Sequence, residues 1–478
     1  MVSSPKAAQI HSIEPASATF DFLVVANRLP VDRVQNPDGT DSWRRSPGGL
    51  VTALAPLMSD ADGAWVGWHG APDEEVEPFL NDGMQLIPIE LSADEVELYY
   101  EGFANATLWP LYHDVIAQPE FHRTWWDVYR RVNRRFAEAT ARYAAPGATV
   151  WVQDYQLQLV PQLLRELRPD LRIGFFNHIP FPPLEIFAQL PWRRAILEGL
   201  LGADLIGFQR ASDTSNFLRS VRRFVGAPTH THRVDYQGRV IGARPFPISI
   251  DLAQITELSV RPEIQDRARQ IRHDLGDPDV VLLGVDRLDY TKGIRHRLKA
   301  FSELLEEGRL DVARVTLIQV ASPSRERVAT YQQLRGEIEG IVGRINGSFD
   351  TIENTAVRYL HHTYPIEEMV ALYLAADVML VTALRDGMNL VAKEYVAARA
   401  NNNGALVLSE FTGAADELKQ AILVNPHDID GLKDAIMEAI HIDKPQASRR
   451  MRAMRRQLRD HDVLRWSQEF LQALREQA

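Results

Sequence analysis

The chain of 478 residues contains no cysteine. Disulfides, thiolate metal sites and cysteine nucleophiles are therefore excluded, and a cytoplasmic location fits this composition. No run of about 18 apolar residues occurs, so we expect no membrane-spanning segment. Positive charge is scarce too, because 53 Lys and Arg stand against 64 Asp and Glu, a net charge of −11. This balance disfavours nucleic-acid binding, and an anionic ligand would need locally gathered cations.

Several sequence motifs are also missing. No two glycines are spaced as GxG, so the dinucleotide fingerprint is absent, and no GxxxxGK[ST], HExxH or GxSxG occurs. Asp-x-Asp pairs such as Asp277 and Asp279 lie at predicted turns or caps, where carboxylates are common. None of these pairs follows a buried strand, so the residues predict no metal site. Residues 1–19 are small and polar, without the apolar run of a signal peptide, and indicate a disordered extension.

Strand and helix patterns alternate along the chain in two successive series. The first series begins at residues 22–26 and the second at residues 280–285. The segment 241–250, with Pro245 and Pro247, is predicted to cross between two domains. The predicted fold class is therefore α/β, with two doubly wound parallel sheets that face each other. Ligands of such sheets bind beyond the carboxyl ends of the strands, so the residues just after each strand are the functional candidates.

One strand–loop–helix unit stands out in the second series. The apolar run 378–382 predicts a strand, and residues 390–400 predict a helix. The loop between them carries Asp386, which could cap the helix or face a ligand, and Glu394 lies in the second helical turn. The free amides of a helix N-terminus attract anions. An ordinary connection with surface charges would show the same pattern.

Cations follow two other strands of the second series. Arg287 and Lys292 share the loop 286–293, and a fork and a point charge together suit a diphosphate. The alternative is a loop in which they pair with Asp286 and Asp289. Arg325 is predicted to open a helix after the next strand and to hold a second phosphate or part of an acceptor.

Polar residues follow the strands of the first series as well. Strand ends carry an arginine, a glycine pair, an aspartate and a histidine, and an aromatic segment lies between them. An aromatic edge with a hydroxyl suits sugar stacking, although aromatic residues are more often core. Together the two series predict a cleft enzyme that transfers a group from a nucleotide-activated donor. The first-series candidates are Arg28, Gly48, Gly49, Tyr100, Trp109, Asp154 and His178.

Nine short segments, in this order, resemble those of the trehalose-6-phosphate synthases of glycosyltransferase family 20. The resemblance extends from about residue 22 to the last predicted helix. It implies a GT-B fold and transfer of glucose from a nucleoside diphosphate glucose, usually UDP-glucose, to glucose 6-phosphate. The segments are residues 27–30, 47–50, 99–100, 108–110, 152–155, 174–182, 287–293, 343–347 and 385–395.

The resemblance also implies the details of the reaction. The product would be α,α-trehalose 6-phosphate, formed with retention by front-face substitution, because no carboxylate nucleophile is supplied. ADP-glucose and GDP-glucose stay open as donors. We expect no metal requirement and no cofactor, no nucleic acid, no membrane contact and a homo-oligomer, either a dimer or a tetramer. No phosphatase domain follows, so conversion to trehalose is not expected.

Site roles carried over from the resemblance divide between the two substrates. Asp154, His178, Arg287, Lys292 and Asp386 are expected to serve catalysis. The remaining donor contacts would be Gly48, Gly49, Tyr364, Gly387, Met388, Asn389, Leu390, Val391 and Glu394, and the acceptor contacts Arg28, Tyr100, Trp109, Asp154 and Arg325.

The resemblance implies three parts after residues 1–19. Residues 20–247 would form the acceptor-binding domain and residues 248–459 the nucleotide-sugar domain, with a closing helix in 460–478 packed back onto the first. Gln153 and Asn177 depart from the family pattern, where His and Leu are common, and could shift substrate preference. Two alternatives stay open: a catalytically silent sugar-phosphate-binding paralogue, and a phosphorylase or other glycosyltransferase of the same fold.

Overall fold

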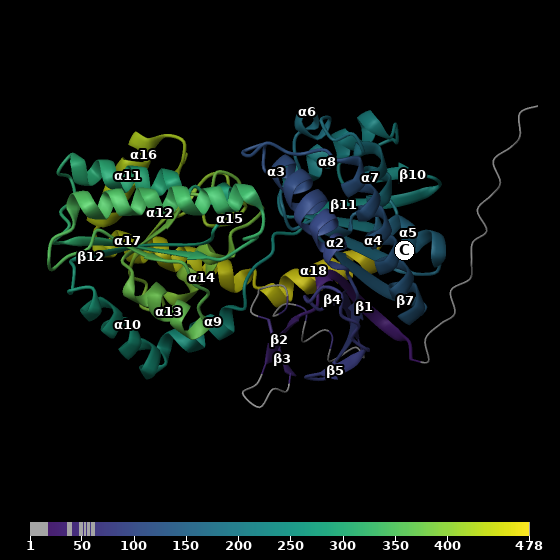
Figure 1. Cartoon of the computed structure of the whole chain (residues 1–478), viewed down its shortest axis with the longest axis horizontal. Helices are drawn as coiled ribbons and strands as arrows, with labels where there is room; N and C mark the ends of the chain where they lie inside the picture. The colour runs from purple at the N-terminus through teal and green to yellow at the C-terminus, as the bar shows by residue number, and fades with distance from the viewer. Residues whose placement is uncertain are drawn as a thin grey trace, which may run out of the picture.

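The chain folds into two α/β halves, seen side by side in the computed structural model of Figure 1. The structure describes residues 18–35, 41–46, 51, 54, 58 and 63–477. Most of the predicted extension and both Gly48 and Gly49 lie outside these residues. Two doubly wound sheets are present, so the predicted fold class is confirmed. No helix of the described part is long and apolar enough to cross a bilayer.

The first half is built on a sheet of nine strands. Its central strands run parallel, and antiparallel pairs close both edges. The two remaining strands of this half, β2 (Val31–Gln35) and β3 (Asp41–Arg45), form a separate hairpin. The sheet order is β10 (Arg233–Tyr236), β11 (Arg239–Pro245), β9 (Leu205–Phe208), β8 (Arg172–Phe176), β7 (Ala144–Gln153), β1 (Phe20–Arg28), β4 (Ala64–Trp68), β6 (Met84–Ile89) and β5 (Phe79–Asn81).

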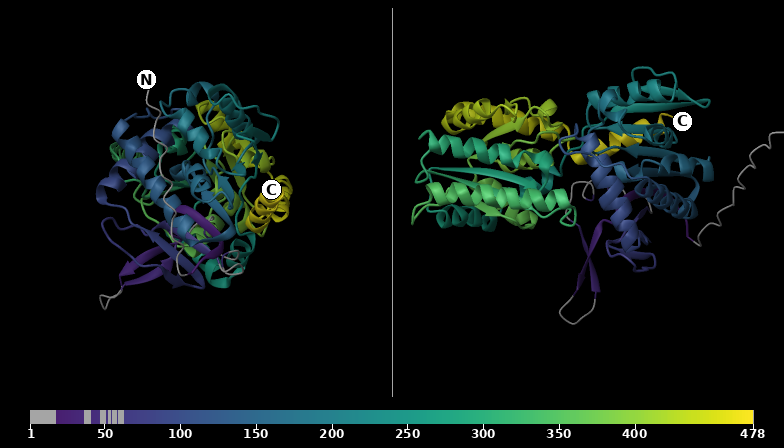
Figure 2. Two further views of the ribbon diagram at one scale, coloured as in Figure 1. Left: turned by 90° about the vertical axis from the view of Figure 1, so that its right-hand side faces the viewer. Right: turned by 45° about the horizontal axis from the view of Figure 1, so that its top comes forward.

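The second half contains a sheet of six strands, all parallel. Helices cover both of its faces, as Figure 2 shows in side view. The order is β14 (Val357–Leu360), β13 (Val315–Ser322), β12 (Val280–Arg287), β15 (Val378–Val381), β16 (Ala405–Ser409) and β17 (Ile422–Val424).

Helices connect the strands within each half. Those of the first half are α2 (Ala93–Glu95), the π-helix η1 (Val96–Leu108), α3 (Trp109–Tyr112), α4 (Arg123–Tyr143), the 3₁₀ turn η2 (Tyr155–Leu157), α5 (Val160–Leu167), α6 (Leu184–Phe187), α7 (Arg193–Leu200) and α8 (Ala211–Phe224). Those that follow are α9 (Leu252–Val260), α10 (Pro262–Asp274), the 3₁₀ turn η3 (Tyr290–Lys292), α11 (Ile294–Glu306), α12 (Ala329–Phe349), α13 (Ile366–Ala375), α14 (Leu390–Ala398), α15 (Ala414–Glu417), α16 (Ile429–His441), α17 (Lys444–Asp460) and α18 (Val463–Arg475).

Both faces of the first sheet are buried, as β1 illustrates. Leu23 and Val25 face the core that includes α4, whereas Phe22 and Val24 face the opposite core. Parallel strands that are covered on both sides form continuous apolar runs, which explains why residues 22–26 were recognisable as a strand.

The last helix, α18, returns to the first half after the chain has completed the second. Its Phe470 stacks on Trp151 of β7 at 4.4 Å between ring centroids, and Trp466 lies edge-on to Phe176 of β8. The indole nitrogen of Trp466 also donates to the carbonyl oxygen of Phe246. Figure 1 shows α18 in yellow among the strands of the first half. The domain boundaries at 247 and 459 stay a prediction.

Two local predictions are wrong. Residues 241–245 do not cross between domains but belong to β11, which pairs in parallel with β9 from Gly242 to Pro245. Pro245 is tolerated because it is the last residue of the strand. Arg325 does not open a helix either, since α12 begins at Ala329 and Arg325 lies before it with φ +51°.

Candidate active site

Each sheet has a point where the strand order reverses. In the first sheet the chain passes from β1 to β4 on one side and later to β7 on the other; in the second sheet β13 and β15 flank β12 in the same way. Ligands bind in the crevice at such points, beyond the carboxyl ends of the strands. Arg28 and Arg287 end β1 and β12, and Asp154 and Asp386 follow β7 and β15. Predicted residues thus lie at both crevices.

An ion pair occupies the crevice of the second sheet. The ammonium of Lys292 lies 2.6 Å from Oδ2 of Asp386, and Asn389 donates to the same oxygen at 3.1 Å. Burial alone would raise the pKa of Asp386, but Lys292 and Asn389 outweigh it, so that its pKa lies below the usual value. The carboxylate is therefore held ionised, with its direction fixed by two donors.

Close backbone contact brings these two loops together. The amide of Leu384 donates to the carbonyl oxygen of Thr291 at 2.7 Å. Gly293 has φ +64°, and a Cβ there would lie 2.0 Å from the carbonyl oxygen of Thr382. Only glycine meets both conditions, so Lys292 is placed against the 383–389 loop by the backbone itself.

The start of α14 is stabilised by Asn389. This residue adopts φ +87°, and its side chain accepts from the amide of Ala392 at 3.0 Å. The neighbouring Gly387 lies against the first half, because a Cβ there would lie 2.3 Å from the carbonyl oxygen of His178. Leu390 and Val391 begin the helix and Met388 is buried beside it. The amides of this segment form a helix N-terminus at the crevice, the arrangement that binds phosphate.

Glu394 points from α14 toward Tyr373, whose hydroxyl donates to its Oε2 at 2.7 Å. Burial raises the pKa of Glu394 above the usual value, and the tyrosine hydrogen bond opposes this shift. Tyr364 lies farther along, in the loop after the edge strand β14, with its ring near His362. Glu394 and Tyr364 both lie in segments that begin beyond the carboxyl ends of strands of the second sheet.

Asp154 is the buried carboxylate of the first crevice. It adopts φ +70°, and its Oδ1 accepts from the amide of His178 at 3.0 Å. Burial raises the pKa of Asp154 to about 6, although the amide of His178 and the charge of Arg287 oppose the shift. A carboxylate with this pKa is ionised at neutral pH and can accept from a sugar hydroxyl.

His178 is held neutral beside it. Burial lowers the pKa of His178 to about 3, and its Nε2 lies 2.9 Å from Oε1 of Gln153. Because a carboxamide oxygen only accepts, Nε2 carries the proton. Asn177 instead donates to the carbonyl oxygen of Ile179 at 2.5 Å. Gln153 therefore bonds across to the segment after β8, whereas Asn177 bonds within that segment.

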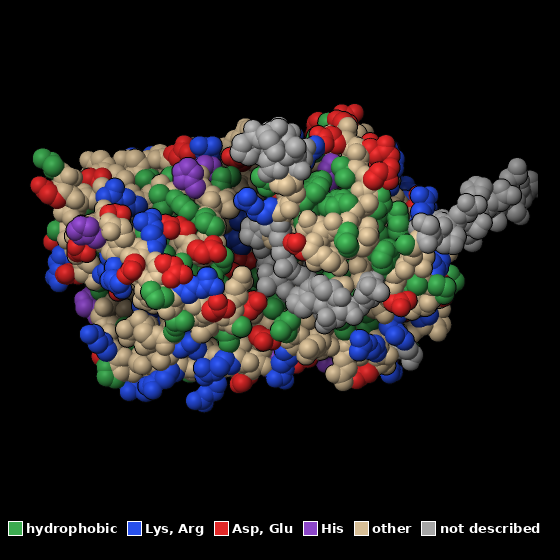
Figure 3. All heavy atoms as spheres, turned by 90° about the horizontal axis from the view of Figure 1, so that it is seen from below, with side chains coloured by type: hydrophobic (Ala, Val, Ile, Leu, Met, Phe, Trp, Pro, Cys, Tyr) green, Lys and Arg blue, Asp and Glu red, His purple; other side chains and the backbone are tan. Residues whose placement is uncertain are grey.

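A cleft of about 590 Å³ is lined by predicted site residues of the first half. Arg28, Tyr100, Asp154 and His178 all line it. The guanidinium of Arg28 lies 5.1 Å from the ring of Trp68. Seen from below, the molecular surface is hollowed between the two halves, with Lys and Arg side chains beside the hollow (Figure 3).

Arg325 does not line that cleft, but its side chain lies in a buried network next to it. Its Nη1 is 2.7 Å from Oδ2 of Asp289, its Nη2 is 3.3 Å from the hydroxyl of Tyr155, and its Cζ is 3.8 Å from the Trp109 ring centroid. Arg287 flanks the same ring at 5.5 Å. Burial would raise the pKa of Asp289, but Arg325, Arg287 and Lys292 lower it to about 2. Trp109 thus links the predicted donor and acceptor residues.

The chain is similar to known proteins along almost its whole length. The sequence model of glycosyltransferase family 20 matches residues 20–476. The trehalose-6-phosphate synthase of Mycolicibacterium smegmatis is 59% identical over 470 residues, which cover 96% of this chain and 93% of that protein. The chain belongs to glycosyltransferase family 20. The resemblance to trehalose-6-phosphate synthases is thereby confirmed, and the chain is a glycosyltransferase.

Two solved structures of the family are similar along almost the whole length. A UDP-forming α,α-trehalose-phosphate synthase from Burkholderia xenovorans, in complex with glucose-6-phosphate, has a TM-score of 0.86 and 34% identity, and covers 95% of this chain and 100% of that one. A chain from E. coli described as bound with UDP-2-fluoro glucose has a TM-score of 0.86 and 33% identity, and covers 95% and 98%. This family-20 chain therefore has the GT-B fold.

Sequence reasoning missed several residues of this family-20 site. His113 is buried, stacks on Trp109 at 4.1 Å, and places its Nδ1 2.8 Å from the carbonyl oxygen of Trp109. Burial lowers its pKa to about 4. Asp289 was considered only as a loop ion-pair partner, but it organises Arg325. His113 does not follow a strand, so the rule that selected the others could not find it, whereas Asp289 lies in the loop of Arg287 and Lys292 and its contact with Arg325 depends on tertiary packing.

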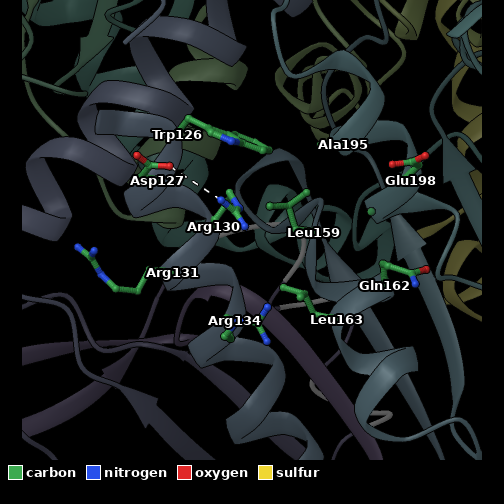
Figure 4. A pocket seen from close by; sticks show the side chains of 11 residues that line it. Trp126, Asp127, Arg130, Arg131, Arg134, Leu159, Gln162, Leu163, Ala195 and Glu198 are labelled. Carbon is green, nitrogen blue, oxygen red and sulfur yellow. Dashed lines mark ion pairs between the residues drawn. The ribbon is translucent and has the colours of Figure 1, made fainter. Parts of the chain in front are cut away.

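A second pocket, of about 460 Å³, lies away from both crevices, between α4, α5 and α7 (Figure 4). Arg130 and Arg134 of α4 line it together with Leu159 and Leu163, and Arg130 pairs with Asp127 at 3.9 Å. None of the predicted site residues lines this pocket. Among the described residues, no group of three or more His, Asp or Glu has a metal-binding arrangement.

Proposed function

We propose that this family-20 chain transfers glucose from UDP-glucose to glucose 6-phosphate and forms α,α-trehalose 6-phosphate with retention. Relatives described as UDP-forming, as bound with UDP-2-fluoro glucose and as in complex with glucose-6-phosphate support this proposal. The observation that carries it is the position of Lys292, paired with Asp386, in one crevice while Asp154 and His178 lie in the other. ADP-glucose and GDP-glucose stay alternative donors.

The second half would bind the donor. Arg287 ends β12 on the cleft side without a hydrogen bond or ion pair to any described residue, so its guanidinium is available for the diphosphate. Lys292 has three N–H donors and can keep Asp386 while it binds a phosphate oxygen. The remaining donor contacts would be Gly48, Gly49, Tyr364, the amides of Gly387, Met388, Asn389, Leu390 and Val391, and Glu394 for the ribose.

The first half would bind the acceptor. Arg28 and Tyr100 line the cleft next to Asp154, where an arginine and a hydroxyl can hold a phosphate and a carboxylate can hold sugar hydroxyls. Arg325 would support the phosphate from the second half. Because Asp289, Tyr331 and Tyr155 already accept hydrogen bonds from its guanidinium, Arg325 would keep these buried partners and contribute positive charge beside Trp109.

Retention by double displacement would need a free carboxylate beneath the anomeric carbon. Asp386 is bound by Lys292 and Asn389, and Asp154 accepts from the amide of His178. We therefore favour front-face substitution. The bond between C1 and the diphosphate oxygen breaks, the acceptor hydroxyl oxygen bonds to C1 on the same face, and its proton passes to the leaving diphosphate. Arg287 and Lys292 would stabilise the charge that develops there.

One assay tests the proposal. The protein is mixed with UDP-glucose and glucose 6-phosphate, and UDP and trehalose 6-phosphate are measured, with ADP-glucose and GDP-glucose in parallel. Acceptor-dependent UDP release together with the disaccharide phosphate supports it. No release with any donor would favour the silent paralogue, whereas turnover of trehalose 6-phosphate with orthophosphate alone would favour a phosphorylase.

Three further properties are proposed on the basis of the resemblance. Activity should survive EDTA, because the resemblance implies no metal. A homo-oligomer would elute in size-exclusion chromatography ahead of the 54.1 kDa chain. A fractionated host cell should contain the protein in the cytoplasm.

A further inference from the structure

Arg385 directly precedes Asp386, and its side chain reaches into the other half of the molecule. Its Nε lies 3.2 Å from Oδ2 of Asp114, and its Nη2 lies 3.6 Å from Oδ1 of Asp213. Asp114 follows α3 and Asp213 lies in the first turn of α8, so both carboxylates belong to the first half. One guanidinium thus joins the loop of Asp386 to two separate elements across the cleft.

Arg385 and Asp213 are buried whereas Asp114 is partly exposed, and the two ion pairs are poorly matched in geometry. Asp213 is 0% exposed, and neither its oxygens nor Nε of Arg385 makes a well-aligned hydrogen bond with a side chain of the described residues. Charge attraction is present, but the aligned bonds of a bidentate pair are not. The contact therefore leaves hydrogen-bonding capacity of Arg385 and Asp213 unused at the junction of the two halves.

The segment that carries Asp114 is strained. Asp114 has φ +56° and Val115 has φ +59°, a left-handed conformation that a β-branched residue rarely adopts. Such backbone persists only where its surroundings impose it, and it concentrates at functional sites. The strained segment follows His113, which stacks on Trp109. Asp114, the partner of Arg385, is therefore linked through the adjacent His113 to Trp109, the ring that Arg287 and Arg325 also contact.

We propose that Arg385 is a positioning residue that locks the Asp386 loop onto Asp114 and Asp213 when the two halves close, so that the donor glucose is aligned only in the closed enzyme. The inference rests on the proposed function. Gly387, two residues further on, already touches the carbonyl oxygen of His178, so the loop is in contact with the first half on both sides of Asp386. Closure also excludes water from the donor.

The test uses Arg385→Met in the full-length protein, with Arg385→Lys as the variant that keeps the charge. We expect Arg385→Met to lower kcat/KM for UDP-glucose by about 10- to 100-fold, because small misplacements of reacting groups have effects of this size. KM for glucose 6-phosphate should change less than about twofold, because Arg385→Met and the wild type should bind the acceptor equally well. Acceptor-independent hydrolysis of UDP-glucose should rise relative to transfer. Arg385→Lys should recover part of the loss.

Asp416→Asn provides the matched control. Asp416 of α15 makes another ion pair between the halves, with Arg210 at 2.7 and 2.9 Å, but it lies outside the loop of Asp386. Its kinetic constants and hydrolysis ratio should stay at the wild-type values. The side chain of Asp114 is 38% exposed, so the Asp114→Asn variant should fold. It is expected to shift the same ratio in the direction of Arg385→Met.

Wild-type constants and an unchanged hydrolysis ratio in Arg385→Met and Asp114→Asn would overturn the inference. So would an equal loss in Asp416→Asn, because the effect would then belong to the interface in general. If Arg385→Met does not fold, the ratio measured in Arg385→Lys and Asp114→Asn decides. A wild-type protein that releases no UDP would overturn the proposed function instead, so the two failures are distinguishable.

Discussion

Lys292 and Asp386 lie 94 residues apart in the sequence and form an ion pair of 2.6 Å between the loops that follow two neighbouring strands. Both side chains are nearly buried, with 10% and 14% exposure. A buried pair of this kind is costly to leave half-formed, because the remaining charge loses its partner. The proposed diphosphate contact and the proposed sugar contact therefore depend on each other.

Replacing Lys292 by alanine should lower the turnover of UDP-glucose and glucose 6-phosphate strongly. The loss expected is about 2–4 kcal/mol of transition-state stabilisation, by analogy with the removal of one donor to a developing oxyanion. Initial rates at saturating substrates measure it. Lys299→Ala, an exposed lysine of α11 paired with Glu303, is the control and should be silent. Unchanged turnover in Lys292→Ala would refute the assignment.

Asp154→Asn should remove an acidic limb from the pH profile. Since burial raises the pKa of Asp154 to about 6, the wild-type carboxylate loses its charge as the pH falls through 6, and kcat/KM for glucose 6-phosphate should fall with it. The variant should be weakly active without that limb. Rates between pH 5 and 8 in a constant-ionic-strength buffer measure the effect.

The same substitution lowers activity but should increase the stability of the fold. A carboxyl group whose pKa is higher in the folded than in the unfolded state stabilises the fold while protonated, and that contribution is lost as the pH rises through 6. Asp154→Asn should therefore raise the melting temperature at pH 8, and by more than it does at pH 5. A lower melting temperature at pH 8 would contradict the raised pKa.

Trp109→Leu should raise KM for glucose 6-phosphate. The ring lies 3.8 Å from Cζ of Arg325, and a desolvated cation–π contact contributes up to about 2 kcal/mol. Trp109→Phe keeps an aromatic face and should have the smaller effect. Initial rates over a range of acceptor concentrations compare the two variants. Equal KM values in Trp109→Leu and the wild type would remove the ring from acceptor binding.

Asn389→Ala should destabilise the protein more than Asn389→Gly. Alanine loses the cap on Ala392 and must adopt φ +87°, which together cost about 1–3 kcal/mol, whereas glycine tolerates that conformation. Urea denaturation gives the difference in unfolding free energy. Equal losses in the two variants would show that the backbone conformation is not the constraint.

The rule that ligands bind beyond strand ends predicted the positions of Arg28, Asp154, Arg287 and Asp386, because each follows a strand that borders a reversal in strand order. Apolar runs with both faces buried, such as β1 and β15, were recognisable from composition alone. The rule could not identify what holds those residues, since pairing across long stretches of chain depends on tertiary packing.

Other residues show the same limit in more detail. The strained turn at Asp114 and Val115, the buried His113 and the partners of Arg385 have no local signature, because each depends on an element distant in the sequence. Arg325 was assigned a helical position, but its left-handed backbone directs the guanidinium inward to Asp289. Gly48 and Gly49 lie outside the described residues, so their donor role stays a prediction.

Because α18 packs on the first half, the fold of that half can be completed only after the second half has been synthesised. Phe470 and Trp466 fill the face of the first sheet that includes Trp151 and Phe176, although more than 300 residues of chain separate them from Trp151. The apolar face of the first sheet therefore stays uncovered during synthesis until α18 has been made. A chain that stops before residue 463 would keep the strands and helices of the second half, yet it would expose the apolar face of the first sheet that α18 covers.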